Sequence, residues 1–382
     1  MLKRILFVHD QIPGQGISGM IIFYRHFVQL TDYEIHILVP DYCHYDKSDL
    51  PPNFYIHYFS LRKKYWPPFR EQSSLLRNIR ITQLSKLIVN KLDAIQPSIV
   101  ITVLYHYFAV ATFKALKKRN IPLITFLHDN WMLKTNSLHL KKVRKKLGSK
   151  IIERSNLNLS VTRELINEYS SHSNASDLFY PIPAGFTYPY APSKNRILNL
   201  FYAGTIEEHH FKLFEKLAEE MNKLPLKFSI ITNSTNKLEH LTDIQYVPSF
   251  KTNTEAIKYM HDNADCILVN YGRTFDENPY AATSFPSKFI EFSHLSKPIL
   301  AVAPFNSPFK NFLESKNYDL CWDGYDLSAL EIIVTKLLQP DIYLEYAKAI
   351  KKIALEDFSS FHLQNKFKNY LISLEKKNQN ET

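Results

Sequence analysis

The segment spanning residues 284–303 (SFPSKFIEFSHLSKPILAVA) places a lysine and a glutamate in the first turns of an expected helix. Pro286 suits a first helical turn, which Ser284 or Ser287 is expected to cap. Lys288 lies in that first turn, where a cation is unfavourable for the helix dipole unless an anion is bound. A diphosphate would supply the anion, and Glu291 lies close enough to reach hydroxyl groups such as those of a ribose. The segment therefore predicts a site for a phosphorylated, hydroxyl-bearing ligand.

Polar side chains also follow two other runs of strand length. His128 comes directly after an apolar run at 123–127, and Asn270 and Arg273 come after a second run at 266–269. Ligands of open parallel sheets bind beyond the carboxyl ends of the strands. These three side chains are therefore expected to line a ligand site, while the nearby Trp131 is expected to serve in packing.

A glycine-rich loop near the start of the chain spells GxGxxG, with glycines at Gly14, Gly16 and Gly19. Together with Asp41 it has the outline of a dinucleotide-binding fingerprint. In that fingerprint the first glycine turns directly off the strand, whereas five residues separate Val8 from Gly14 here. The loop is better interpreted as the lining of a wider cleft, with Gly16 facing an anionic or hydroxyl-rich ligand.

The composition favours a globular protein with an anionic partner. The 47 Lys and Arg residues exceed the 37 Asp and Glu residues and give a formal net charge of +10, which attracts phosphorylated ligands or membrane lipids. The three cysteines are widely spaced, form no metal-ligand pattern and suggest a reducing compartment. The first residues do not resemble a signal peptide, and no window approaches the ~20 apolar residues that span a bilayer. We expect a cytoplasmic protein without a metal site, acting at the inner face of the membrane.

Two basic clusters support that membrane contact. One lies on an expected helix at 141–150, and the other, at 62–70, mixes basic residues with tryptophan, tyrosine and phenylalanine, a combination that suits a lipid interface. The residues expected to contact the acceptor or the membrane are Lys63, Lys64, Trp66, Lys142 and Lys145.

Runs of strand length alternate with segments of helical period along nearly the whole chain, which predicts an α/β protein with two parallel sheets. The proline-rich stretch at 186–196 is the best linker. The expected parts are an N-terminal Rossmann-like acceptor domain at 1–185, the linker, a C-terminal Rossmann-like donor domain at 197–356, and a last helix and polar tail at 357–382 that return to the first domain. Strands are expected at 197–203, 228–232, 266–269, 299–302 and 318–322 of the second domain.

Several segments in order along the chain resemble one enzyme family. The PSK–E–F–KP pattern of that family is matched by seven residues in order: Pro286, Ser287, Lys288, Glu291, Phe292, Lys297 and Pro298. LFYAGTI at 200–206, TFLHDNWML at 125–133 and the glycine loop at 13–19 agree with it. Together they resemble the retaining, two-lobed glycosyltransferases of the glycogen-synthase-like type, glycosyltransferase family 4. Three positions depart from the family: Ser296 replaces a glycine, Thr205 replaces the usual arginine, and Thr283 replaces a glutamate.

The resemblance implies a GT-B fold, with two doubly wound domains facing across a cleft, and a sugar transferred with retention from UDP or GDP to a glycan or lipid-linked acceptor. It implies no cofactor beyond the donor, no obligatory metal and no nucleic-acid partner. The implied catalytic residues are His128, Lys288 and Glu291, with His128 facing the donor sugar and Glu291 the ribose. The candidates for the cation that binds the diphosphate are Lys288, Lys212 and Arg273, in that order. The implied donor-binding residues are Gly16, Gly204, Thr205, Lys212, Asn270, Arg273, Ser284 and Ser287.

Three other classes of protein remain as alternatives at this point. The glycine loop with Asp41 would suit an NAD-dependent oxidoreductase. A nucleotide-sugar epimerase of the same fold would bind the same donor and need no acceptor. A non-catalytic membrane or nucleic-acid binding module would account for the net charge of +10 alone.

Overall fold

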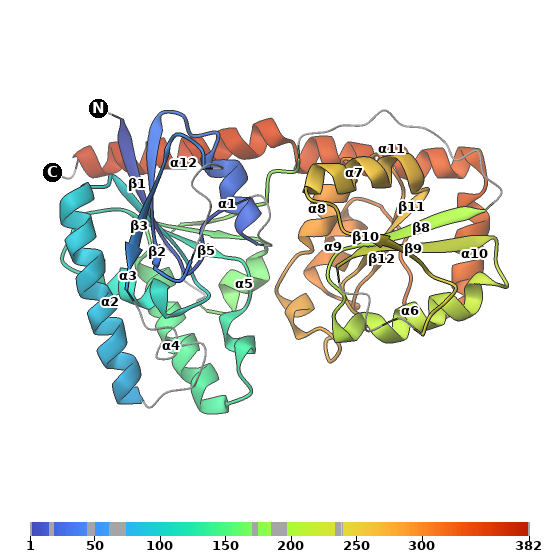
Figure 1. Ribbon diagram of the computed structural model, residues 1–382, viewed down its shortest axis with the longest axis horizontal. Helices are drawn as coiled ribbons and strands as arrows, with labels where there is room; N and C mark the ends of the chain where they lie inside the picture. The colour runs from blue at the N-terminus through green and yellow to red at the C-terminus, as the bar shows by residue number, and fades with distance from the viewer. Residues whose placement is uncertain are drawn as a thin grey trace. The chain divides into compact units, whose positions relative to one another are not determined.

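The computed structural model describes residues 2–14, 19–43, 50–60, 74–169, 175–184, 197–233, 238 and 240–380. The chain divides into two compact units (Figure 1). Unit 1 comprises Met1–Pro181 together with Phe361–Thr382, and unit 2 comprises Ile182–Ser360. The expected boundaries were 185/186 and 356/357, and the whole linker expected at 186–196 lies outside the described residues.

Unit 1 is built on a seven-stranded parallel sheet. Its strands are β1 (Lys3–Val8), β2 (Tyr33–Pro40), β3 (Phe54–Phe59), β4 (Ile99–Val103), β5 (Leu123–Leu127), β6 (Leu157–Ser160) and β7 (Ser176–Leu178). They lie in the order β3-β2-β1-β4-β5-β6-β7. The chain thus proceeds outward from β1 to β3 and then starts again on the other side of β1, so the switch in direction falls between β1 and β4. Such a switch point opens a crevice at the carboxyl ends of the strands.

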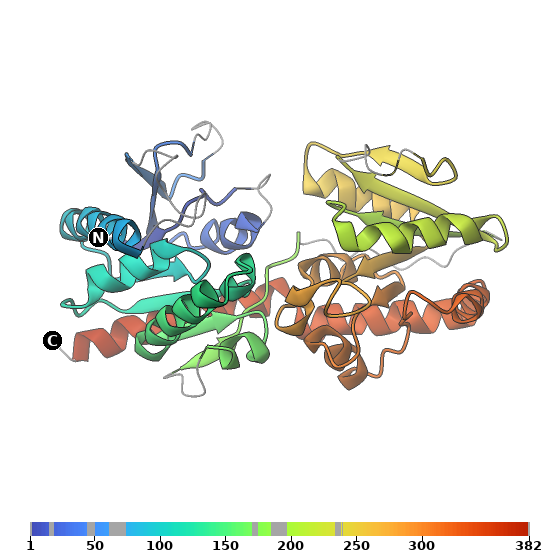
Figure 2. The same ribbon diagram turned by 90° about the horizontal axis from the view of Figure 1, so that it is seen from below.

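Helices cover both faces of this sheet, which is why its strands are apolar on both sides. They are α1 (Met20–Phe27), α2 (Ser74–Ile95), α3 (Tyr107–Leu116), the 3-10 turn η3 (Trp131–Lys134), α4 (Leu138–Arg154), α5 (Arg163–Asn167) and α12 (Ser360–Asn380). The last helix, α12, packs with α1 on one face, where Phe367 contacts Phe27 and Phe126. Buried His26 of α1 is 2.9 Å from the Gln364 side-chain oxygen of α12. The C-terminal helix is therefore part of unit 1 (Figure 2).

Unit 2 contains a five-stranded parallel sheet. Its strands are β8 (Leu198–Ala203), β9 (Leu226–Thr232), β10 (Gln245–Pro248), β11 (Cys266–Asn270) and β12 (Ile299–Val302). In the order β10-β9-β8-β11-β12, the switch point lies between β8 and β11. The strand expected at 318–322 is wrong: only a single bridge joins Cys321 to Ala301. The short strands β7 and β10 were not predicted.

The helices of unit 2 are α6 (Glu208–Met221), α7 (Asn253–Asn263), the 3-10 turn η4 (Pro279–Ala282), α8 (Ser287–Ser293), α9 (Pro308–Ser315), α10 (Leu327–Leu337) and α11 (Pro340–Asp357). Aromatic packing fixes α8, because Phe285 and Phe289 lie 5.4 and 5.0 Å, ring centre to ring centre, from buried Phe309 of α9. Among the helices of the described residues, none is both long and apolar enough to cross a bilayer.

Candidate functional site

The carboxyl end of β8 brings a glycine and a lysine together at the switch point of unit 2. Gly204 follows β8 with φ of +132°, a backbone conformation that favours glycine. The Lys288 side chain of α8 lies directly against it, so that a Cβ at position 204 would overlap the Lys288 ammonium group. Gly204 and Lys288, both expected to bind the donor, are therefore in direct contact, although they stand 84 positions apart in the sequence (288 − 204).

A buried tyrosine holds the Lys288 ammonium in this position. Lys288 Nζ donates a hydrogen bond of 2.8 Å to the hydroxyl of Tyr202, which is fully buried, and lies 4.4 Å from the centre of the tyrosine ring. The Tyr202 hydroxyl donates in turn to the backbone oxygen of Thr205, at 2.8 Å. The tyrosine therefore ties α8 to the loop that follows β8.

His210 of α6 completes this network. The backbone N–H of Glu207 donates to His210 Nδ1 at 2.9 Å, so Nδ1 is the nitrogen without a proton. Nε2 then carries the proton and donates to the Tyr202 hydroxyl, 3.0 Å away. Tyr202 accepts from Lys288 and His210 and donates to Thr205, which uses the full capacity of its hydroxyl.

Among the described residues, Lys288 has no carboxylate within ion-pair distance of its ammonium group. Burial lowers the pKa of Lys288 to about 8, and Glu207 offsets this only in part. At neutral pH the amine is still mostly protonated, yet no carboxylate among the described residues forms an ion pair with it. A partly buried cation without a counter-ion favours an anionic ligand. Since α8 has only seven residues, we attribute this preference to the ammonium group rather than to the helix dipole.

Glu291 and Asn270 lie in the same unit with their own partners. The Glu291 carboxylate, one turn beyond Lys288, accepts a hydrogen bond of 2.8 Å from the Asn253 side chain at the start of α7. Asn270 ends β11 and accepts from the N–H of Gly272 at 3.0 Å. Its amide nitrogen is buried and has no hydrogen-bond partner among the described residues. An unpaired buried donor at a strand end is a natural contact for a ligand oxygen.

Arg273 is a weaker candidate for a phosphate clamp than Lys288. Its guanidinium Nε lies 2.9 Å from a Glu277 carboxylate oxygen, and the group stacks 4.3 Å from the ring centre of Tyr325. Gly324 packs closely on the arginine side chain. Hydrogen bonding to Glu277 raises the pKa of Arg273, and that carboxylate already neutralises its charge.

The other expected donor residues of unit 2 vary in their placement. Thr205 and Lys212 are exposed, Lys212 on α6. Ser284 is buried, and exposed Ser287 is the first residue of α8. The prediction that Ser284 or Ser287 caps this helix is wrong, because the N-cap is Pro286, which makes no side-chain cap hydrogen bond.

Ser296, which the sequence comparison placed where the resembling family has glycine, has a backbone conformation that favours glycine. It adopts φ of +53°, in the left-handed region, and is buried. Its hydroxyl has no hydrogen-bond partner among the described residues. This chain therefore keeps the turn between α8 and β12 with a side chain that is unfavourable there.

In unit 1, His128 lies just past β5 and lines a small apolar hollow with Phe126, Leu159 and Phe179. Trp131 is buried and packs edge-on against Tyr107 at 5.1 Å, as expected for a packing residue. The remaining acceptor-side predictions divide into two groups. Lys142 and Lys145 are exposed on α4. Gly16, Lys63, Lys64 and Trp66 lie outside the described residues.

Sequence reasoning missed three residues of the unit 2 site, namely Tyr202, His210 and Asn253. Tyr202 stands in the YAG segment that the family resemblance already singled out. A polar aromatic residue near the end of a buried strand was the available signal. His210 and Asn253 carried no such signal, because their partners Tyr202 and Glu291 come from other elements.

Comparison with known proteins gives a consistent result. Residues 23–186 match the model of Glycosyltransferase Family 4, while a search of the curated proteins finds no match. Sucrose-phosphate synthase from Thermosynechococcus elongatus is 13% identical, with a TM-score of 0.70 over 97% of this chain and 99% of its own. HepE from Anabaena in complex with UDP is also 13% identical, with a TM-score of 0.70 over 97% and 100%. WaaG, a glycosyltransferase involved in lipopolysaccharide biosynthesis, is 12% identical, with a TM-score of 0.62 over 96% and 99%. At these identities the structural likenesses establish the fold.

Proposed function

We propose that this chain is a glycosyltransferase of the family 4 type, and that it transfers a sugar from a nucleotide-diphosphate sugar to a glycan or lipid-linked acceptor; the match of residues 23–186 to Glycosyltransferase Family 4 and the shared fold support this. The observation that carries the proposal is the Lys288 ammonium, which is held against Gly204 and has no carboxylate partner in the described part of the chain. A diphosphate is the anion that such a donor provides. HepE has been solved with UDP and with UDP-glucose, which supports UDP as the nucleotide.

The chemistry assigned to these residues is electrostatic. The acceptor oxygen forms a bond to the anomeric carbon, the bond from that carbon to the diphosphate oxygen breaks, and the acceptor proton leaves with the diphosphate, with retention of configuration. Lys288 stabilises the charge that develops on the leaving group, and Glu291 holds a ribose hydroxyl. His128 supports the positive charge that develops on the donor sugar.

A thermal-shift panel with UDP, GDP, ADP and CMP tests the donor class. A nucleotide that binds only the folded protein stabilises it by roughly 2.7 kcal/mol at 100 times its Kd, and we expect the largest rise in Tm with UDP. The matching sugar nucleotide should be hydrolysed slowly without an acceptor. If NADH raises the Tm and no nucleoside diphosphate does, the glycosyltransferase proposal is wrong and the result favours an NAD-dependent oxidoreductase.

Membrane docking of unit 1 is the second part of the proposal. Leu75, Leu76 and Ile79 are exposed at the start of α2, directly after the aromatic and basic segment at 62–70. On α4, exposed Leu138 precedes a row of exposed lysines. Apolar side chains beside lysines suit an anionic lipid surface. This surface would bring the protein to a lipid-linked acceptor in cell-surface polysaccharide synthesis.

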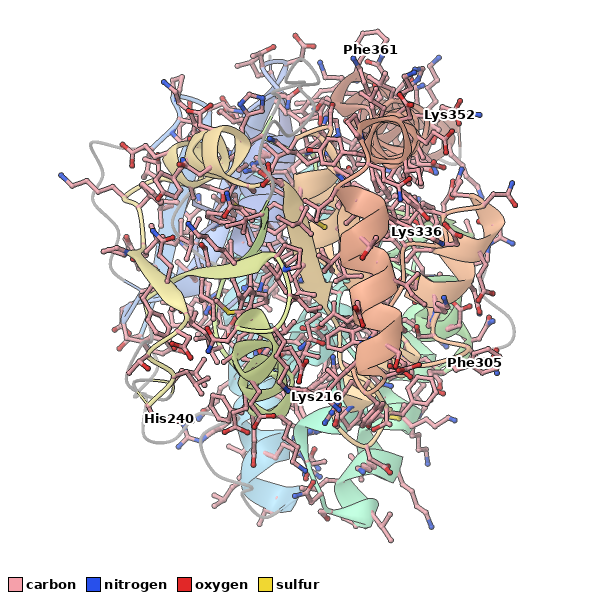
Figure 3. All side chains as sticks on the ribbon, turned by 90° about the vertical axis from the view of Figure 1, so that its right-hand side faces the viewer. Lys216, His240, Phe305, Lys336, Lys352 and Phe361 are labelled. Atoms are coloured by element: carbon pink, nitrogen blue, oxygen red, sulfur yellow. The ribbon has the colours of Figure 1, made fainter. Side chains whose placement is uncertain are left out.

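Flotation with vesicles that contain anionic phospholipid tests the docking. Replacing Lys142 and Lys145 by glutamine should weaken binding about 30-fold, since each lysine near the surface contributes roughly 1 kcal/mol. The matched control replaces Lys336 and Lys352, exposed lysines of α10 and α11 in unit 2 (Figure 3), and should bind like the wild type. Equal losses in both double variants would show a general charge effect and refute a docking surface on unit 1.

A further inference from the structure

Helix α8 carries two side chains assigned to the donor, and each is held by a residue from another element. Lys288 reaches the hydroxyl of Tyr202, near the end of β8. Glu291, three residues further along α8, accepts a hydrogen bond of 2.8 Å from the side-chain amide of Asn253. Asn253 is the first residue of α7. It therefore fixes a group that the donor chemistry uses, although the sequence did not mark it as part of the site.

Helices α7 and α8 start at the same edge of the unit 2 sheet. α7 follows β10 and α8 follows β11, so both begin beyond the carboxyl ends of parallel strands. Figure 1 shows them on one face of the sheet, with α6 on the other. Ligands of open parallel sheets bind at this edge. The contact between Asn253 and Glu291 therefore lies on the side of unit 2 where a donor would bind.

The start of α7 holds Asn253 in a fixed position. The hydroxyl of Thr252, the N-cap, accepts from the N–H of Glu255 at 3.2 Å, and the Glu255 carboxylate accepts from the N–H of Thr252 at the same distance. This reciprocal capping box satisfies two backbone donors of the helix end. The side chain of Asn253 is therefore not needed for capping, and its amide donates to Glu291 instead.

The Glu291 carboxylate gains a defined orientation from this contact. Glu291 is half-buried, between the buried residues Ile290 and Phe292. A glutamate side chain has several rotamers, and a ligand that must order it loses roughly tenfold in affinity. The hydrogen bond from Asn253 selects one rotamer in advance. A carboxylate has about four acceptor sites, so this single amide bond does not exhaust its capacity to bind hydroxyl groups.

We propose that Asn253 is a positioning residue that makes Glu291 selective for the ribose of the donor. This role rests on the proposed function, in which Glu291 holds a ribose hydroxyl. The amide keeps the carboxylate oriented for that hydroxyl before the nucleotide arrives. Because Asn253 acts through Glu291, its effect should be confined to nucleotides that carry ribose hydroxyls.

A merely structural role for Asn253 would give a different result. The residue begins α7, where an acidic side chain interacts favourably with the helix dipole. Asn253→Asp keeps the size of the side chain and suits that position. It also removes the amide donor and places a second carboxylate beside Glu291. The substitution therefore favours the helix while it opposes the orientation of Glu291, and so separates the two roles.

The test compares two nucleotides by calorimetric titration at pH 7, namely UDP and 2′,3′-dideoxy-UDP, which lacks both ribose hydroxyls. The wild type should bind UDP roughly tenfold to 100-fold more tightly, the worth of a hydrogen bond to a charged group. Asn253→Asp and Asn253→Ala should each weaken UDP binding by about tenfold. Both variants should bind the dideoxy nucleotide like the wild type.

The matched control is Asn222→Asp, which alters another pair of an asparagine amide with a carboxylate in the same unit. Asn222 donates to the Asp243 carboxylate at 3.2 Å, and both residues are exposed. This variant should bind both nucleotides like the wild type. If Asn253→Ala does not fold, Asn253→Asp, which suits a helix start, carries the test. Equal weakening of both nucleotides in the Asn253 variants, or unchanged binding of UDP, would overturn the proposal.

Failure of this proposal and failure of the proposed function are separable through Glu291→Gln. A wild type that binds UDP and the dideoxy nucleotide equally would refute the ribose role of Glu291 in the proposed function. A wild type that discriminates between them, with the discrimination lost in Glu291→Gln but kept in both Asn253 variants, would keep that role and refute the positioning role of Asn253.

Discussion

The two switch points of this molecule differ in charge although they share a topology. In unit 2, Lys288 lies against Gly204 and Tyr202 at the end of β8, and this cation forms no ion pair with the described residues. In unit 1, the equivalent crevice between β1 and β4 holds Asp10, balanced by Lys134 and bonded to His106. Topology places a crevice in each unit, and the local side chains decide what it attracts. A cationic crevice favours a phosphorylated donor, whereas a crevice with balanced charges has no such preference.

The comparison also separates two ways of holding a buried lysine. Lys288 rests on a neutral tyrosine, whose hydroxyl is saturated by His210 and Thr205. Lys134 lies near two carboxylates, Asp10 and Asp129, which raise its pKa against the effect of burial. The first arrangement leaves the cation available to an incoming anion, and the second does not.

The largest expected effect comes from Gly204→Ala. The new Cβ would displace the Lys288 ammonium and force alanine to φ of +132°, and donor affinity should fall by about tenfold to 100-fold, the worth of a hydrogen bond to a charged group. Calorimetric titration with UDP measures it. Gly19→Ala is the control, because Gly19 also has positive φ (+80°) but open space around its Cβ position. A similar loss of affinity in both variants would show that backbone strain alone is responsible.

Tyr202→Phe should have the next largest effect. It removes the hydroxyl that positions Lys288 but keeps the aromatic ring, and we expect donor affinity to fall about fivefold, since a buried hydrogen bond contributes roughly 1 kcal/mol. Tyr318→Phe is the control in the same unit, because the Tyr318 hydroxyl bonds only to the backbone of Ile299 in the described structure. Tyr318→Phe should lower stability without changing UDP affinity, and the reverse pattern would contradict the role of Tyr202.

The pH dependence sharpens the contrast between the two lysines. The pKa of Lys288 is lowered to about 8 in the folded protein, so donor affinity should weaken about tenfold per pH unit above pH 8. Because the unfolded chain binds more protons between about pH 8 and 10.5, Lys288 and Lys134 should both make stability rise with pH across that window. Lys134→Met should leave the pH dependence of UDP binding intact. If it removes that dependence, the two crevices are not separate in function.

Ser296→Gly is expected to have the smallest effect. It relieves a left-handed residue and removes a buried hydroxyl without a partner, which outweighs the greater freedom of glycine in the unfolded chain. We expect a gain of about 1 kcal/mol in the free energy of unfolding, measured by denaturant titration with UDP affinity unchanged. A loss of stability would show that the Ser296 side chain makes a favourable contact in the folded protein.

The fold was largely predictable because long buried strands and helices repeat in the sequence. The runs at 123–127 and 266–269 correspond to β5 and β11, within one residue at each end. The short strands β7 and β10 were not predicted because they are three and four residues long, and most of their residues are polar or at least half-exposed. The run at 318–322 has strand-like residues, but only Cys321 pairs with the sheet, since Tyr318 turns its hydroxyl to the backbone of Ile299.

The sites were only partly predictable, because they depend on contacts between distant residues. Lys288 and Gly204 were each expected to bind the donor, but their direct packing depends on φ at Gly204 and on the position of α8. Asp10 and His106 stand 96 residues apart (106 − 10), and only the pairing of β1 with β4 brings them together. Polar residues directly after both strands were the available signal, but nothing in the sequence indicated that they meet.

The most direct test of the central claim is the affinity of the protein for UDP before and after Lys288→Met, measured by calorimetry at pH 7. The substitution keeps an unbranched side chain, one atom shorter than that of lysine, and removes its charge. We predict that UDP binds the wild type and that its affinity falls at least tenfold in the variant, with uridine, which lacks the diphosphate, unaffected. Equal binding of UDP by the two proteins would contradict the assignment of Lys288 as the diphosphate-binding cation of unit 2.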